Sequence, residues 1–72
     1  MIRASRVTVL YASGRYRADW VGGPRGGLCV TRPGKRGGVL LTGAQGAEYR
    51  DAIATALDDA ERADLCRAAL RP

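Results

Sequence analysis

The 72-residue sequence contains no histidine and no phenylalanine, and it has only two cysteines, one tryptophan and one lysine. Without histidine, and with Cys29 and Cys66 far apart in the chain, a zinc site has too few ligands. General acid–base and nucleophilic catalysis likewise lack their usual side chains. The sequence therefore predicts no metal, no cofactor and no enzymatic activity.

Long hydrophobic runs are also missing. The apolar run at residues 7–12 is shorter than the core of a signal peptide, and no stretch approaches the ~20 residues of a membrane span. We therefore expect a cytoplasmic protein with no membrane partner. In that compartment Cys29 and Cys66 are expected to be reduced, although a disulfide joining a strand to the last helix stays open.

The length predicts one small domain over residues 1–72. A chain of this size buries only about 60% of its unfolded surface on folding, so its stability is expected to be marginal. Ten glycines and few large apolar side chains leave a thin core. We expect a homodimer, formed through the C-terminal helical segment, to supply part of the missing burial.

Alternating side chains predict strands at residues 6–12, 15–21, 28–32 and 39–41. Ser13-Gly14, the glycine-rich residues 22–27, and Pro33-Gly34 as the centre of a type II turn should connect them. The expected faces are Val7, Val9 and Tyr11 together on the first strand, and Tyr16, Ala18 and Trp20 opposite Arg15, Arg17 and Asp19 on the second. Together these signals predict a four-stranded antiparallel meander.

Helix follows the sheet. Thr42 is a candidate N-cap with Gln45 as its capping-box partner, although Gly46 allows a start delayed to about Ala47. The apolar face expected from the spacing comprises Tyr49, Ile53, Ala56, Leu57 and Ala60. After Ala60 the apolar phase slips, and Asp58 with Glu61 forms a fresh capping pair. We therefore predict an α+β fold with one kinked or two short C-terminal helices, the second covering either another chain or the far edge of the sheet.

Positive charge is concentrated in the predicted sheet half. Residues 1–46 carry eight basic side chains and one acid, whereas residues 47–72 carry four basic side chains and six acids. A basic sheet with Arg/Gly-rich loops favours binding of nucleic acid, single-stranded DNA or RNA, with little sequence preference. The candidate contacts are Arg15, Arg17, Trp20, Arg25, Arg32, Lys35 and Arg36. Tyr11, Tyr16 and Trp20 can serve either as base-stacking platforms or as core.

The arrangement resembles one known family. The residues involved are an aromatic strand, the Pro-Gly-Lys-Arg-Gly turn that begins at Pro33 and runs into Gly-Val-Leu-Leu-Thr, and a helix led by Tyr49. Over residues 15–57 they resemble the transcriptional coactivator (positive cofactor four) family of single-stranded-DNA-binding proteins. The resemblance implies a homodimer packed through its helices that grips single strands across its sheets. The matching contacts are Arg15, Arg17, Trp20, Lys35 and Arg36.

A second class stays open. Short self-contained αβ chains also include phage or mobile-element proteins that inhibit a host complex by protein–protein binding, as anti-CRISPR inhibitors do. Such a protein would use the arginine-rich surface, or the apolar strip at residues 65–70, against a protein partner. Its positive charge fits a protein that occupies an acidic patch or competes on a nucleoprotein complex. A small structural module without a ligand is the third interpretation.

Overall fold

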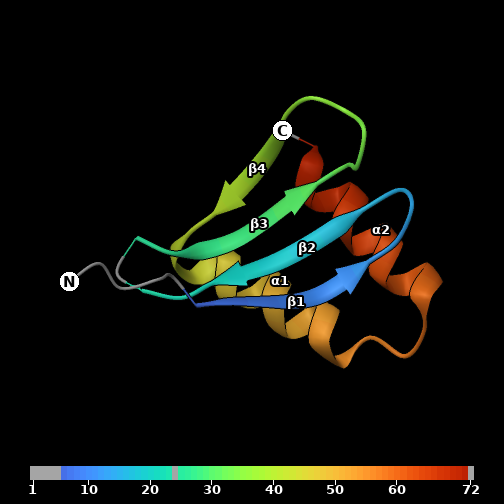
Figure 1. Cartoon of the computed structure of the whole chain (residues 1–72). Helices are drawn as coiled ribbons and strands as arrows, with labels where there is room; N and C mark the ends of the chain where they lie inside the picture. The colour runs from blue at the N-terminus through green and yellow to red at the C-terminus, as the bar shows by residue number, and fades with distance from the viewer. Residues whose placement is uncertain (1–5, 24, 72) are drawn as a thin grey trace.

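The computed structural model describes residues 6–23 and 25–71. Four strands, β1 (Val7–Ala12), β2 (Arg17–Val21), β3 (Gly27–Thr31) and β4 (Gly38–Leu41), form an antiparallel sheet in sequence order. Two helices, α1 (Gly43–Thr55) and α2 (Asp59–Leu70), lie together behind one face of this sheet (Figure 1). The predicted α+β meander is therefore confirmed, and of the two alternatives for the C-terminal segment, one kinked helix or two short helices, the structure has two helices.

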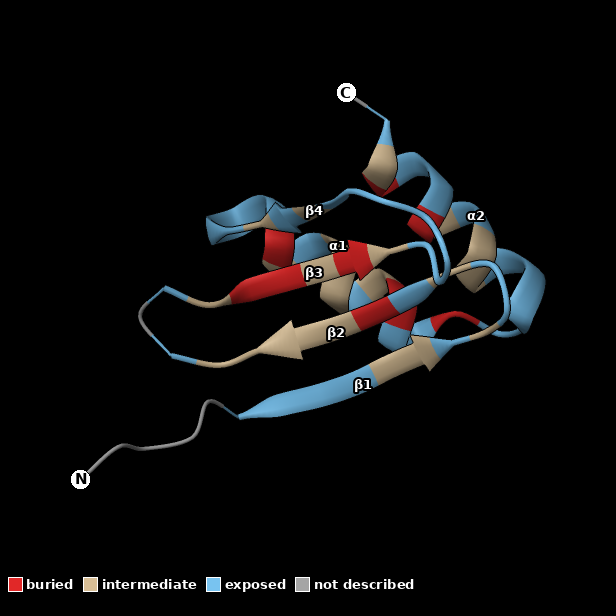
Figure 2. Ribbon diagram, turned by 45° about the horizontal axis from the view of Figure 1, so that its top comes forward, coloured by how far each residue is buried: buried red, intermediate tan, exposed pale blue. Residues whose placement is uncertain are grey.

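The covered face of the sheet holds most of the core. Ala18, Leu28 and Val30 on β2 and β3 are fully buried, and Ile53 of α1 and Cys66 of α2 meet them from the other layer. Trp20 and Tyr16 are only partly buried and pack at the edge of this cluster. Figure 2 shows the burial concentrated on β3 and declining toward β1, the edge strand.

A bulge changes the predicted faces of β1. Val9 pairs with Asp19, but Tyr11 pairs with Ala18, so the register shifts between Val9 and Tyr11. The shift turns Tyr11 toward the covered face, where it packs against the core. The expectation that Tyr11 shares a face with Val7 and Val9 is wrong, because one extra residue reverses a two-residue period.

Helix α1 begins at Gly43, directly after β4. Thr42 occupies the N-cap position, but its side chain makes no capping hydrogen bond, so the predicted box with Gln45 is absent, and the delayed start at Ala47 is wrong. Gly43 itself has φ of 64°, a conformation that glycine adopts without steric cost. The backbone of Gly43 turns the chain sharply from the strand into the helix, so this turn, and not a capping side chain, marks where the helix begins.

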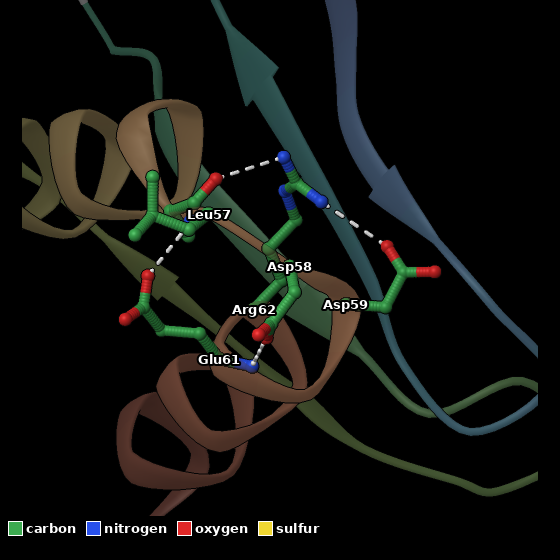
Figure 3. Close-up of polar contacts among 6 residues, drawn as sticks. Leu57, Asp58, Asp59, Glu61 and Arg62 are labelled. Atoms are coloured by element: carbon green, nitrogen blue, oxygen red, sulfur yellow. Dashed lines mark hydrogen bonds and ion pairs between the residues drawn. The ribbon is translucent and has the colours of Figure 1, made fainter.

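The junction between the helices follows the predicted break at Asp58. The Asp58 carboxylate accepts a 2.8 Å hydrogen bond from the Glu61 backbone N–H, and the Glu61 carboxylate accepts one of 2.9 Å from Leu57 (Figure 3). Arg62 donates to the Ala56 carbonyl at the end of α1 and to Asp59 at the start of α2. These contacts hold the two helices at a defined turn.

Two residues of the expected helical face lie in solvent. Leu57 is 91% exposed in the junction, and Ala60 is exposed in the first turn of α2. Both were predicted on the apolar face by extending the periodicity of α1 past its end. The break resets the phase, and α2 instead buries Cys66 and Ala69. Helix α2 contacts β3 and β4, so it covers the sheet of its own chain.

Within residues 6–23 and 25–71, no helix or strand covers the other face of the sheet. Val7, Val9 and Leu40 on this open face are each about half exposed, at 53%, 51% and 53%. Cys29 lies in the same row, because it pairs with Asp19 on one side and Leu40 on the other. Both cysteines are free thiols, and the sheet separates Cys29 from the buried Cys66.

Candidate functional site

Basic side chains gather at one end of the molecule. In an antiparallel meander the β1–β2 turn and the β3–β4 loop lie at the same end of the sheet, and the last turn of α2 reaches that end as well (Figure 1). We call this region the basic end. It contains Arg15, Arg32, Lys35, Arg36, Arg67 and Arg71.

Each hairpin tip at the basic end has a defined turn. Gly34 has φ of 79° and the Lys35 N–H donates to the Arg32 carbonyl at 2.9 Å, which confirms the predicted type II turn around Pro33-Gly34. In the β1–β2 turn, the Ser13 hydroxyl accepts hydrogen bonds from the backbone N–H groups of Arg15 and Tyr16. Rigid turns therefore hold the backbone from which these cations extend.

A surface pocket of about 390 Å³ lies between the β3–β4 loop and the end of α2. Its lining carries four arginines and no acid: Tyr16, Arg32, Arg36, Gly37, Gly38, Val39, Arg67, Leu70 and Arg71. Tyr16, Val39 and Leu70 also pack against the core, so they are anchored from behind. The pocket therefore combines an apolar, anchored wall with a basic rim.

The charges at the basic end are largely uncompensated. Arg67 pairs with Asp64, three residues earlier on the same helix. Among the described residues, no ion pair is made by the other cations of the basic end, namely Arg15, Arg32, Lys35, Arg36 and Arg71. Exposed pairs such as Arg67–Asp64 contribute little energy, so Arg67 can exchange this partner for an anionic ligand.

The structure brings together four of the seven predicted contacts, Arg15, Arg32, Lys35 and Arg36. Arg15 precedes β2 and lies in the turn, so it is not on the strand where it was expected. Arg25 lies in the β2–β3 loop, at the opposite end of the sheet. The positive surface is therefore the end of the sheet and not its open face.

Arg17 and Trp20 lie on β2 but on opposite faces. Arg17 is on the open face, where its guanidinium pairs with Asp19 at 3.0 Å. Trp20 is on the covered face, packs against the core, and has the Arg50 guanidinium 4.5 Å from its ring centroid. In this arrangement the Trp20 ring serves the core and a cation–π contact, and it is turned away from the open face.

Arg67 and Arg71 were not among the predicted contacts. They belong to residues 47–72, where acids outnumber basic side chains, so the net charge of this half gives no sign of a basic site. Their spacing of four residues would place them on one side of a continuous helix, which is the sequence signal that could have joined them; in the structure Arg67 is in the last turn of α2 and Arg71 is its C-cap residue. Only the packing of α2 against β4 puts that side next to the β3–β4 loop.

Other kinds of site find little support among residues 6–23 and 25–71. No group of three histidine, cysteine or acidic side chains in this part of the chain is placed to hold a metal ion. Burial raises the pKa of the Cys66 thiol, which keeps it protonated and unreactive in the core. Neither described helix is long and apolar enough to cross a membrane.

Comparison with known proteins finds no match: no family model, no curated protein and no solved structure matches the chain. The resemblance to the positive cofactor four family and its homodimer therefore stay predictions. The physical features of the basic end carry the functional argument alone.

Proposed function

We propose that this protein binds the backbone of a nucleic acid through its basic end, with single-stranded DNA as the expected ligand and little preference for sequence. The observation that carries this proposal is the convergence of arginines from two separate segments, the β3–β4 loop and the end of α2, on one pocket. Arginine presents a planar set of donors that matches phosphate oxygens.

The nature of the side chains favours contacts with phosphates over contacts with base edges. The basic end offers charged groups on loops and at the end of α2, and one tyrosine, Tyr16, whereas base-edge readout in duplex DNA usually inserts a helix or ribbon into a groove. Both helices lie along the sheet in this fold (Figure 1). Tyr16 at the pocket offers a surface on which one base can stack.

Titration of an internally labelled oligothymidine at 50 and 200 mM salt tests the proposal. Four to six phosphate contacts on a single strand predict a fall in affinity of about 50- to 300-fold over this range, from a slope of about −0.7 per contact. A duplex of the same length should compete less well. Absence of binding at 50 mM salt would overturn the proposal.

A pair of variants locates the surface. The double variant Arg32→Ala/Arg36→Ala should lower affinity at least about tenfold at low salt, and reduce the salt slope by about 1.4. Arg25→Ala is the matched control, because Arg25 is an exposed arginine at the other end of the sheet. Equal losses in the two proteins would mean that the basic end has no special role.

The open face favours a second candidate, binding to a protein partner. Val7 and Val9 on β1 and Leu40 on β4 expose about half of their surface on one face, at its two edges, and apolar side chains left exposed on one face are a feature of protein interfaces. The apolar strip at residues 65–70, expected as a partner surface, packs against the core in this fold, so an inhibitor of a host complex would use the open face in its place. If no oligonucleotide binds, partner capture from the source cell with wild type and Leu40→Asp as baits distinguishes this function, because only the wild type should retain the partner.

A further inference from the structure

We propose that the pocket at the basic end binds the terminal phosphate monoester of a nucleic-acid strand, so that the protein prefers phosphorylated ends over internal positions. This inference rests on the proposed function and specifies the ligand of the same site. It concerns Arg32, Arg36, Arg67 and Arg71, the four arginines that line the pocket.

The charge of the pocket exceeds what one internal phosphate can neutralise. Four guanidinium groups line it, the lining has no acid, and only Arg67 has an ion-pair partner, Asp64, among the described residues. The C-terminal end of α2, with its free carbonyl groups, carries about half a negative charge, which repels an anion. Roughly two and a half positive charges remain. A phosphodiester carries one negative charge, whereas a phosphate monoester carries about 1.5 to 2 at neutral pH.

The arrangement of the arginines suits an end group with three free oxygens. Arg32 and Arg36 approach from either side of the type II turn, Arg67 approaches from the last turn of α2, and Arg71 from the C-cap position directly after it. Arginines on both sides can therefore reach different oxygens of one phosphorus atom. In a diester, two of the four oxygens are esterified, and they accept such hydrogen bonds poorly.

The shape of the pocket also favours a strand end. Its volume of about 390 Å³ lies at the lower end of the range for small-molecule sites, which suits one nucleotide. Val39 of β4 and Leu70 of α2 belong to the lining, and these two elements pack directly on each other. A strand that enters between the loop and the helix therefore meets packed protein and cannot continue between them.

Competition with unlabelled oligonucleotides of one sequence measures this preference. Three ligands differ only at their ends: 5′-phosphate, 3′-phosphate, and hydroxyl at both ends. We expect at least one phosphorylated ligand to bind about tenfold tighter than the hydroxyl form, the scale of one charge-assisted hydrogen bond. The two phosphorylated arms show which end of the strand the pocket takes.

Two single variants connect the preference to the pocket. Arg36→Gln and Arg71→Gln should each reduce the ratio between phosphorylated and hydroxyl ligands toward one. Arg15→Gln is the matched control, since Arg15 is part of the basic end but not of the pocket lining, and it should weaken both ligands equally. Circular dichroism establishes whether each variant is folded. If a variant is unfolded, the ratio of affinities for phosphorylated and hydroxyl ligands in the wild-type protein still tests the inference.

The outcomes separate the two proposals. Equal, salt-dependent binding of all three ligands by the wild-type protein would overturn the end preference and leave the proposed function intact. Lack of binding to any of them would overturn the proposed function itself. A preference for phosphorylated ends that survives in Arg36→Gln and Arg71→Gln would place the end group elsewhere and overturn the assignment to this pocket.

Discussion

Both faces of the sheet carry aliphatic side chains, but only one of them is covered by the helices. On the covered face Ala18, Leu28 and Val30 are fully buried. On the open face Val9 and Leu40 remain about half exposed, although they are as aliphatic as Leu28 and Val30. On β2 the sequence pattern indicated the inner face, because Ala18 and Trp20 alternate with Arg17 and Asp19. On β1 and β4 an aliphatic side chain does not by itself mark the inner face, and only the packing of the two helices on one side shows which side chains are covered.

The centre of the open face also differs in its polar content. Arg17 and Asp19 form an ion pair there, and the Arg17 side chain is 48% exposed. Such exposed pairs stabilise a fold by little. The covered face is therefore expected to provide most of the stability, while the open face is available for a partner. Four predictions test this division.

The largest effect is expected at Leu28. Leu28→Ala should lower the free energy of unfolding by about 2–5 kcal/mol, because it removes a fully buried side chain and leaves a cavity. Leu40→Ala, its counterpart on the open face, should change it by less than about 0.5 kcal/mol. Urea unfolding measures both. Similar losses would mean that the open face is covered in solution, as in a dimer built on that face.

Gly46 tests how closely α1 approaches the sheet. A Cβ atom at this position would lie 2.2 Å from the Leu41 carbonyl oxygen, so the helix or β4 must shift. Gly46→Ala should destabilise by about 1–3 kcal/mol despite the higher helix propensity of alanine. Gly14→Ala is the control, because nothing lies within 4 Å of the new methyl group and φ of Gly14 is not positive. Thermal unfolding should show Gly46→Ala alone with a lowered Tm.

Asp58 tests the junction that directs α2 onto the covered face. Asp58→Ala removes the acceptor for the Glu61 N–H and should reduce stability by about 0.5–2 kcal/mol. Asp51→Ala, which removes only an exposed ion pair with Arg50, should have a smaller effect. Chemical denaturation provides the comparison. A larger loss in Asp51→Ala would show that the cap is not what stabilises the junction.

The smallest effect is expected from pH, and the two cysteines allow a matched comparison. Burial raises the pKa of Cys66 above its ordinary value of 9.0. The unfolded thiol then ionises at a lower pH than the folded one, so its contribution to stability is complete below pH 9.0 and declines as pH rises further. Cys66→Ala should reduce this decline, whereas Cys29→Ser on the open face should preserve it. Unfolding curves from pH 8 to 10 measure the difference.

Local signals predicted most of the fold. Pro33-Gly34 formed the expected type II turn, because proline and glycine favour its two backbone conformations regardless of context. Asp58 and Glu61 likewise predicted the break between the helices. Both signals act over three or four residues, so no tertiary contact was needed to interpret them.

Features that depend on distant contacts were missed. The bulge that turns Tyr11 inward depends on pairing with β2, and the exposure of Leu57 depends on where α2 packs. The candidate site depends both on local sequence signals and on contacts between distant residues. Arg32 and Arg36 were identified from the sequence, but Arg67 and Arg71 were not, since they join the site only when α2 lies beside β4.

The amino-acid sequence by itself determined the order of strands and helices, their turns, and the excess of positive charge in the first half of the chain. These properties arise from backbone preferences and side-chain composition, which act locally. Tertiary packing alone decided the register of β1, which turns Tyr11 inward, and which arginines surround one pocket. Residues separated by more than thirty positions meet there only because burial of Ile53 and Cys66 holds both helices against the same side of the sheet.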